Sequence, residues 1–505
     1  MAVRRSVAFL AVSAILTGCG GDGGSTTTSG PTAATPTPTA TPAPTSTAAG
    51  CSLRERQDWV ATQLREWYLF YDTLPSSFDP TRYTDVGTYL DSLTATARAQ
   101  NKDRYFTYLT SIKEENAYYN SGSIAGFGWR FGLTQDGRLY VTEAYEGAPG
   151  LIAGVDRGAE IVAIGTSAAN LQITTSLYQS GGGSALSTAL GPDTPGTTRY
   201  FQIRDAGGTR TISVTKSDFT LTPVSSRYGA QIITDAGQRY GYVNLRTFIK
   251  TADPALRAAF QQFRTAGVTN IIVDLRYNGG GGVPIAELLS NLLGGGRSTS
   301  DVMSYTSFRP EKAEYNETTY FTPEPQSVAA TRIAFIGTGN TASASEFVIN
   351  TFPPYLHGNA ALIGSNTYGK PVGQIGLDKT ACDDRLRVIA FATQNAARQG
   401  AYYNGLAVTS NGVPSPLEAS CRADDDISYP MGDPHEASTR SALDFLQGKS
   451  CTRITTATAT ATAIRAAPAT TSAATRAMLV TALREPLLPA GPRISPAQRE
   501  VPGLF

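Results

Sequence analysis

The alternation of hydrophobic and polar residues divides the middle of the chain into regions of different pattern. In residues 51–118, the stretch ERQDWVATQLREWYLFYDTL spaces Trp59, Leu64 and Trp67 at roughly helical intervals. In residues 119–216, the stretch RYFQIRDAGGTRTISVTK alternates apolar and polar residues on both sides of a Gly-Gly turn, which is typical of a β-hairpin. We therefore expect an N-terminal helical region followed by a β-rich domain.

Residues 217–450 alternate between strand and helix patterns. The stretch LRAAFQQFRTAGVTNIIVDLRYNGGGG predicts a helix, a glycine turn, a buried strand and a glycine loop. Further along, RIAFIG predicts a strand that leads into the turn TGNTA, after which a helix begins at Ser343. This order of elements predicts an α/β core, so the chain as a whole is expected to be a multi-domain α/β protein.

The two ends of the chain differ from this middle in composition. Residues 19–50 and 451–505 are rich in small and polar residues and in Pro. We expect a tether at the first end and a low-complexity tail at the other, because such segments cannot bury a core. Arg4 and Arg5 precede the apolar run 7–16, which is too short to span a membrane. Residues 1–18 are therefore predicted to be a signal peptide.

The end of this signal, LTGC, resembles the signal of bacterial lipoproteins. The resemblance implies that Cys19 becomes the lipid-modified first residue of the mature protein. An ordinary secretory signal with an incidental cysteine is the alternative. Gly20, rather than an acid, follows Cys19, which by the same resemblance favours the outer membrane of a Gram-negative cell. The expected location is the bacterial cell envelope, with the body of the protein on the periplasmic side.

Charge and cysteine content narrow the class of protein. The 505 residues carry a net charge of +1 without blocks of like charge, so we expect no nucleic-acid surface. Four cysteines remain beyond Cys19, and in an oxidising compartment they predict two disulfides. We favour the pairs Cys51–Cys451 and Cys382–Cys421. A zinc site is the alternative, but the chain has no CxxC pair and only two histidines.

Residues 124–165 resemble a PDZ domain of the bacterial protease type. The resemblance rests on the segments GFGW, EGAPGLIAGV and RGAEIVAIG, with Ala159 in place of the usual acid. PDZ domains hold a C-terminal carboxylate on the N–H groups of a loop and add the peptide as a strand to a sheet edge. A small β-domain without a ligand is the alternative. The resemblance places the carboxylate loop at Ala125, Gly126, Phe127 and Gly128.

Four motifs, taken in order, resemble the carboxyl-terminal processing, or tail-specific, proteases. They are DRYFTYL at 103–109, DLRYNGGGG at 274–282, TASASEF at 341–347 and YGKPVGQ at 368–374. The resemblance covers roughly residues 54–415. It implies a serine endopeptidase with an N-terminal helical region (51–118), a PDZ-like domain (119–216) and a protease core (217–450), and it implies no metal or other cofactor.

A serine hydroxyl needs a base to take its proton before it becomes a good nucleophile. The two histidines, His357 and His435, lie in sequences that predict loops. A lysine can replace histidine when its ammonium is desolvated enough to lose a proton near neutral pH. The family resemblance implies Ser343 as the nucleophile and Lys370 as the base. Their separation is slightly longer than the family pattern, which fits an insertion around TFPPYLHGN.

Further residues are expected to support this Ser–Lys dyad. Glu346 lies one helical turn after Ser343 and on the same face, and Gln374 follows Lys370 by four residues. The resemblance implies that both orient the dyad. The alternatives are a glutamate that caps the helix and a solvent-facing glutamine.

Acyl transfer also requires donors for the oxyanion. The Ala344 N–H at the start of the helix is one candidate. The resemblance points to Gly280 or Gly281 for the second, where glycine allows close approach of the backbone. A phosphate-binding loop is the competing use of these glycines, but no Lys-Ser or Lys-Thr follows them. Asp274 and Arg276 are expected to hold the loop in place.

We interpret the chain as a lipid-anchored serine endopeptidase of the periplasm. Its substrates would be proteins or peptides with apolar C-termini, which the PDZ-like domain recognises, and its contact with the membrane would be the lipid on Cys19. An inactive peptide- or ligand-binding lipoprotein on the same fold is the first alternative. The joint presence of Ser343, Lys370, Glu346 and Gln374 argues against it. A surface adhesion or scaffold lipoprotein is the second alternative, and the oligomeric state is left open.

Overall fold

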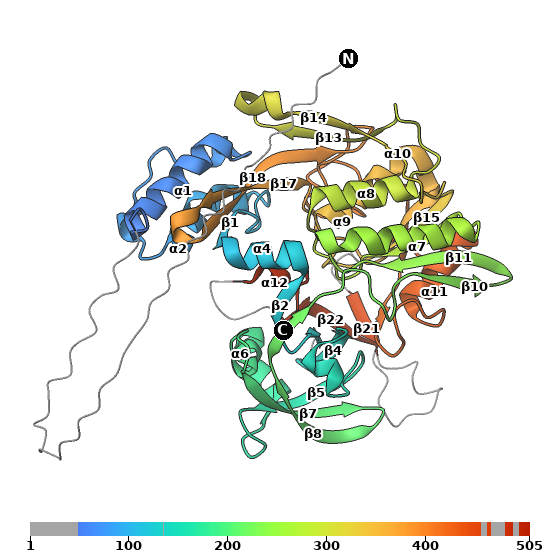
Figure 1. Ribbon diagram of the computed structural model, residues 1–505, viewed down its shortest axis with the longest axis horizontal. Coiled ribbons are helices and arrows are strands. Elements are labelled where there is room, and N and C mark those ends of the chain that lie inside the picture. The colour runs from blue at the N-terminus through green and yellow to red at the C-terminus, as the bar shows by residue number, and fades with distance from the viewer. Residues whose placement is uncertain (1–48, 135, 456–461, 466–479, 488–493) are drawn as a thin grey trace, which may run out of the picture. The chain divides into compact units, whose positions relative to one another are not determined.

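The computed structural model describes residues 49–134, 136–455, 462–465, 480–487 and 494–505 (Figure 1). The predicted signal peptide, the lipid site at Cys19 and almost all of the tether lie outside these residues. The chain divides into the units Met1–Ser46 and Thr47–Phe505, and everything below concerns the second. Among the described helices, none has the length and apolar character needed to cross a membrane.

The N-terminal helical region forms as predicted. Helix α1 (Leu53–Trp67) begins at Ser52, which exchanges capping hydrogen bonds with Glu55. Its inward side buries Val60 and Leu64. These side chains pack against α2 (Val86–Leu93) and against strand β18 (Asp384–Gln394). The helices therefore cover a sheet that contains β18. After α2 the chain forms α3 (Ala95–Ala99), β1 (Tyr108–Ser111) and α4 (Ile112–Ser121).

The sheet below these helices is antiparallel and joins distant parts of the chain. Strand β18 pairs with β1, with β17 (Val372–Lys379) and with β13 (Val302–Phe308). Strand β14 (Glu317–Tyr320) completes the sheet beside β13. Because β17 begins two residues after Lys370, this sheet fixes the position of the predicted base.

The β-rich region also follows the prediction. Strands β7 (Thr198–Asp205) and β8 (Gly208–Thr215) form the expected antiparallel hairpin. With β3 (Trp129–Thr134), β4 (Leu139–Ala144) and β5 (Glu160–Gly165) they make a sheet whose core includes Leu186 and Leu190 of α6 (Thr174–Leu190). The remaining elements of this region are β2 (Ser123–Gly126), which pairs with β9 (Ser217–Thr220), α5 (Pro149–Ile152) and β6 (Gln172–Ile173).

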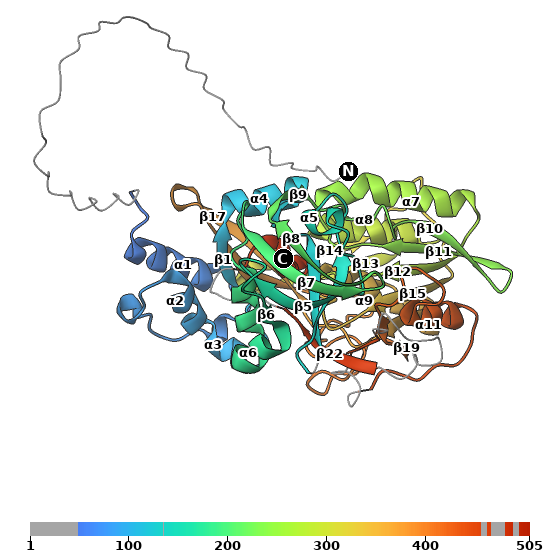
Figure 2. The same ribbon diagram turned by 90° about the horizontal axis from the view of Figure 1, so that it is seen from below.

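The α/β core is built on a six-stranded sheet in the order β10-β11-β12-β15-β16-β19, parallel except for the pair β10–β11. Helices lie on both faces of this sheet (Figure 2). The strands are β10 (Gln231–Asp235), β11 (Gln238–Asn244), β12 (Asn270–Asp274), β15 (Arg332–Gly337), β16 (Ala360–Gly364) and β19 (Ala419–Arg422). The helices are α7 (Asp253–Thr265), α8 (Val283–Leu293), α9 (Ala344–Thr351), α10 (Pro353–Leu356) and α11 (Ala437–Leu446).

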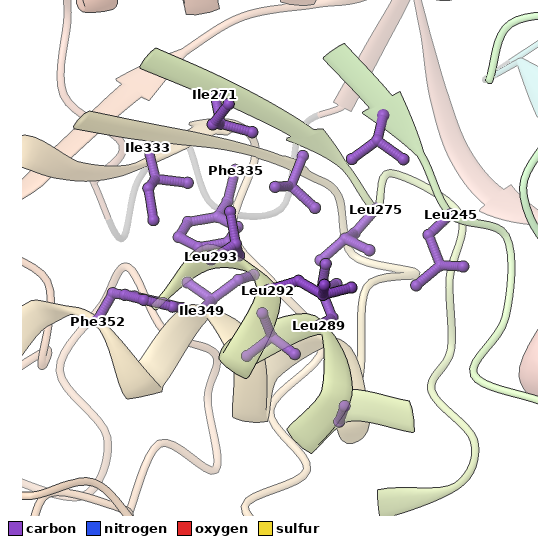
Figure 3. Close-up of a cluster of buried hydrophobic side chains, with 14 of the residues drawn as sticks. Leu245, Ile271, Leu275, Leu289, Leu292, Leu293, Ile333, Phe335, Ile349 and Phe352 are labelled. Atoms are coloured by element: carbon purple, nitrogen blue, oxygen red, sulfur yellow. The ribbon is translucent and has the colours of Figure 1, made fainter. Parts of the chain in front are cut away.

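Side chains on each strand alternate between the two helix layers. Ile271 and Phe335 contribute to the cluster with α8 and α9, which also contains Leu289 and Ile349 (Figure 3). The neighbouring Ile272 belongs to the opposite cluster, with side chains of α11. Because both faces are buried, the strands are continuously apolar, as parallel strands of α/β proteins are. The predicted multi-domain α/β class is thereby confirmed, while the exact domain boundaries stay a prediction.

The predicted disulfide pairing is wrong. The bonds are Cys51–Cys382 and Cys421–Cys451. The Arg56 guanidinium donates to Asp384 with an Nη2–Oδ1 distance of 2.7 Å, which brings the start of α1 to the end of β17. Arg422 N donates to Thr452 O at 2.7 Å, which brings Cys451 beside β19. The spacing of the cysteines along the sequence does not reveal either of these contacts.

Replacing both Cys421 and Cys451 by alanine is expected to lower the free energy of unfolding by about 2–3 kcal/mol, because the unfolded chain gains freedom over the closed loop. Denaturant titration without reductant measures this loss. Equal stability of the variant and the wild type would contradict the bond. Peptide mapping of the non-reduced protein checks the two pairings independently.

Candidate active site

Ser343 lies in a strained turn between β15 and α9. Its backbone has φ 55° and ψ −116°, a conformation that a residue with a side chain rarely adopts. Thr341 fixes this turn by donating its hydroxyl to Leu275 O at 2.7 Å. Strain of this kind persists only where the surroundings enforce it, and it is common at functional sites. Ser343 itself is half-buried.

Glu346 joins the nucleophile turn to the loop of the predicted base. Its carboxylate accepts the N–H of Ser343 at 3.0 Å, that of Gly369 at 2.7 Å and that of Lys370 at 2.7 Å. The side chain is fully buried, and burial raises its pKa although these hydrogen bonds oppose the rise. The contact with Ser343 is a helix cap, but the contacts with residues 369 and 370 reach well beyond the helix. The Glu346 carboxylate is therefore both a helix cap and a link between Ser343 and the loop that carries Lys370.

Lys370 is held in an environment that disfavours its charge. Its ammonium donates to Gln374 Oε1 at 2.9 Å and lies 5.1 Å from the centre of the Phe106 ring. Burial lowers the pKa of Lys370, against the opposing charges of Glu500 and Asp103. Gln374 in turn donates its Nε2 to Phe106 O. The Gln374 side chain thus binds Lys370 through its oxygen and Phe106 through its nitrogen, so it is not simply a solvent-facing glutamine.

The glycine loop lies directly against Ser343. A Cβ placed on Gly280 would come within 2.8 Å of Ser343 Cβ and 3.2 Å of Ala344 N, and the φ of Gly280 is +125°. Only glycine fits there. The Gly280 N–H, however, already donates to Asn278 Oδ1 at 2.9 Å. The Gly280 N–H is thus engaged by this side chain, and its role as an oxyanion donor stays a prediction.

The preceding residue presents its N–H to a peptide carbonyl instead. Gly279 N donates to the backbone oxygen of Glu500 at 2.6 Å. Gly281 forms a β-bridge with Phe248, and its role as a donor stays a prediction. The N–H of Ala344, at the first residue of α9, keeps its place as the other candidate. The described geometry thus favours Gly279 and Ala344 as the donor pair.

Sequence reasoning assigned no role to Asn278, Asp103 and Phe106, which help to build this site. Asn278 accepts hydrogen bonds from Ala342 N at 3.1 Å and Ser345 Oγ at 2.9 Å through its backbone oxygen, which attaches the glycine loop to the nucleophile turn. Asp103 accepts the Phe106 N–H at 2.8 Å and so places the ring beside Lys370. The only signal was their membership of the motifs DLRYNGGGG and DRYFTYL.

Asp274 and Arg276 hold the glycine loop, as expected. Arg276 is fully buried and contacts Asp274 at 2.8 Å, Asp425 at 2.9 Å and Glu436 at 3.0 Å. Burial by itself would raise the pKa of Asp425, but the guanidinium groups of Arg157 and Arg276 lower it below its ordinary value. This buried cluster connects β12 to the segment before α11.

The two histidines lie elsewhere on exposed positions. His357 pairs with Glu418 and His435 with Asp433, and the side chains are 68% and 77% exposed. Both contacts are at the surface, in agreement with the prediction that neither histidine is a catalytic base.

The predicted carboxylate loop is next to the end of the chain itself. Gly128 N and Trp129 N donate to the backbone oxygen of Phe505 at 2.9 and 3.2 Å. A Cβ on Gly126 would lie 2.7 Å from the backbone C atom of Phe505, so the loop permits this approach only with glycine. Ala125 pairs with Asp218 in the short β2–β9 ladder, and Phe127 is fully buried.

Comparison with known families decides what the site belongs to. Residues 239–397 match peptidase family S41, and residues 55–108 match the peptidase S41 N-terminal domain. These two matches together cover less than half of the chain. The segment 239–397 contains the glycine loop, Ser343, Glu346, Lys370 and Gln374.

Similar proteins support this assignment. The chain is 28% identical to the chloroplastic C-terminal processing peptidase of Tetradesmus obliquus over 60% of its own length and 64% of the relative's. It is 24% identical to a carboxyl-terminal-processing protease of Picosynechococcus over 50% and 55% of the two lengths. The matched part thus spans only about half to two-thirds of these relatives.

A solved structure shares the fold. A Bacteroides fragilis protein assigned to the S41 proteases superposes with a TM-score of 0.60 at 22% sequence identity. The superposition covers 77% of this chain and 97% of the other. The shared fold therefore extends beyond the two segments that match by sequence.

Proposed function

We propose that the chain is a serine endopeptidase with Ser343 as nucleophile and Lys370 as general base. The observation that carries the proposal is the Glu346 carboxylate, which binds the N–H of Ser343 and that of Lys370 in one buried contact. Together with the lowered pKa of Lys370, this arrangement provides a strained serine and a lysine that can lose its proton.

The proposed reaction is acyl transfer in two stages. Neutral Lys370 takes the proton of Ser343 Oγ as that oxygen attacks the scissile carbonyl carbon. The N–H groups of Gly279 and Ala344 stabilise the resulting oxyanion. The Lys370 ammonium then gives its proton to the departing amine, which leaves an ester on Ser343. A water molecule, deprotonated by Lys370, hydrolyses that ester and regenerates the serine.

The proposed substrates are proteins or peptides with apolar C-termini, recognised by the PDZ-like region. The loop at 125–128 and the neighbouring edge of β3 support this, because N–H groups there bind a backbone oxygen and a strand. The proposed location remains the periplasmic side of a bacterial outer membrane, through lipid on Cys19. The disulfides support an oxidising compartment.

The test is incubation of an unstructured protein that ends in apolar residues with wild type and with Ser343→Ala, followed by mass spectrometry of the products. We expect cleavage by wild type alone. Cleavage that persists in Ser343→Ala would contradict the assigned nucleophile. Inactivity over several substrates and pH values, both in wild type and in a chain lacking Gly503–Phe505, would favour the inactive peptide-binding alternative.

A further inference from the structure

The end of the chain adds a strand to the β-rich region. Phe131 N donates to Gly503 O at 2.7 Å, and Phe505 N donates to Trp129 O at 2.9 Å. Arg130 and Leu504 face each other in an antiparallel bridge. Residues 503–505 therefore pair with the first half of β3, on the edge whose second half pairs with β22 (Val480–Pro486). Strand addition of this kind is the way a sheet edge binds an extended peptide.

Phe505 fills an apolar pocket beside β3. The residue is 2% exposed and belongs to the core cluster that also contains Phe127, Phe131, Leu186 and Leu190. Its backbone oxygen accepts the N–H groups of Gly128 and Trp129. The main chain and the apolar side chain are thus bound at the same time.

The preceding residues pass over the glycine loop. Glu500 O accepts the Gly279 N–H at 2.6 Å, and a Cβ on Gly279 would lie 2.8 Å from that oxygen. Gly279 adjoins Gly280, which packs against Ser343. The backbone at Glu500 thereby takes the donor that the proposed reaction assigns to the oxyanion. A substrate carbonyl requires the same position.

The Glu500 carboxylate acts electrostatically on the predicted base. It accepts the Tyr119 hydroxyl at 2.8 Å, and Glu500 is 8% exposed as a residue. Burial lowers the pKa of Lys370, and Glu500 is the foremost charge that raises it again. Glu500 therefore favours the protonated lysine, and a protonated lysine cannot accept the serine proton.

The rest of this segment is anchored along its length. Helix α12 (Pro496–Glu500) lies beside α4 (Figure 1). Arg499 lies over the Tyr108 ring at 3.5 Å, and Gln498 donates to Asp193. Ala497, Val501 and Leu504 are buried in a cluster with Tyr118 and Phe219. The segment 494–505 thus contacts the helical region, the β-rich region and the catalytic core together.

We propose that residues 494–505 are a built-in ligand of this chain that occupies both its tail-binding edge and its catalytic groove. The proposal rests on the proposed function for its catalytic consequence. The segment binds as the proposed substrate would, as an extended strand with a buried apolar side chain, and it holds the enzyme in a self-occupied, inhibited state. A substrate must displace it before Ser343 is reached.

Removing Gly503–Phe505 tests the inhibition. The shortened chain keeps every residue of the catalytic groove but loses the hydrogen bonds of Gly503 and Phe505 with β3 and the Phe505 side chain. We expect its kcat/KM on an unstructured protein to rise about tenfold or more, since an attached ligand acts at a high effective concentration. The replacement Phe505→Asp should raise it as well, while Lys449→Ala, at an exposed position outside the segment, should leave it unchanged.

A binding measurement tests the ligand without relying on activity. The shortened chain carrying Ser343→Ala is titrated with a labelled peptide of sequence ISPAQREVPGLF, and fluorescence polarisation is recorded. We expect saturable binding that weakens about 10- to 100-fold when the peptide carboxylate is replaced by an amide, because charge-assisted hydrogen bonds to two N–H groups are lost. The amide peptide is the matched control.

The outcomes separate the two proposals. Peptide binding in a shortened chain that cuts no substrate would support the ligand and contradict the proposed function. Cleavage at the same rate in the full and shortened chains, or equal binding of acid and amide peptides, would overturn the built-in ligand. An intact-mass measurement showing Ser343-dependent loss of the segment from wild type would also overturn the inhibitory role, because the segment would then be a substrate.

Discussion

Replacing either Ser343 or Lys370 by alanine is expected to lower kcat/KM by about 10⁴-fold or more, because a nucleophile and its base act as one unit. The double variant should lose little beyond either single variant. The structure adds a dependence on pH. Lys370 acts in its neutral form, and burial lowers its pKa below the ordinary value of 10.5. Activity should therefore rise with pH through this lowered pKa and be lost as pH falls through it.

Lys370→Arg is the matched control for this prediction. The guanidinium keeps the positive charge and the reach of the side chain but does not lose its proton at accessible pH. The variant should be inactive over the whole pH range, and circular dichroism should show the wild-type fold. A variant Lys370→Ala or Lys370→Arg with the wild-type pH profile would show that another group is the base. The measurement is the initial rate of cleavage of a fluorogenic peptide against pH.

Replacing Arg276 by methionine is expected to lower the free energy of unfolding by about 3–5 kcal/mol. The side chain is fully buried between Asp274, Asp425 and Glu436. Its removal leaves these carboxylates in a desolvated place with only Arg157 to balance Asp425. A buried charge that loses its partner is much more costly than an exposed one. Urea titration followed by tryptophan fluorescence measures the change.

Arg54→Ala provides the comparison. Arg54 also pairs with an aspartate, Asp58, but these side chains are 59% and 54% exposed. Solvent screens such a pair, so its loss should leave the free energy of unfolding nearly unchanged. Because the Arg276 backbone oxygen accepts the Thr338 hydroxyl beside the nucleophile turn, the methionine variant should also lose activity. A loss of stability no greater than that of Arg54→Ala would contradict the structural role of the cluster.

Local patterns predicted most of the core and the places of the dyad. The strand at 271–275 and the helix before it follow from period and turn residues within one short segment, and the structure contains them as β12 and α7. Ser343 was placed at the start of a helix for the same reason. The motif pattern also named Glu346 and Gln374, and their contacts with Ser343 and Lys370 fit an orienting role.

The same pattern could not show which N–H group of the glycine loop would serve as the oxyanion donor. Consecutive glycines carry no side chains that distinguish one N–H from the next, so the sequence left Gly280 and Gly281 open. The direction of each N–H depends on Asn278, which takes the Gly280 proton, and on the backbone that faces Gly279. These contacts exist only after β12, the nucleophile turn and the C-terminal segment have come together.

The sequence by itself determined the α/β class and the strands and helices of the core, because periodicity is a local property of the chain. The candidate residues of the site came from the resemblance of its motifs to a known family. The tertiary structure decided which cysteines pair and where residues 494–505 bind. A low-complexity composition shows only that a segment cannot build its own core. It does not show whether Gly128 and Gly279, far away in the sequence, offer N–H groups to Phe505 and Glu500. That depends on contacts between distant parts of the chain, which no local pattern records.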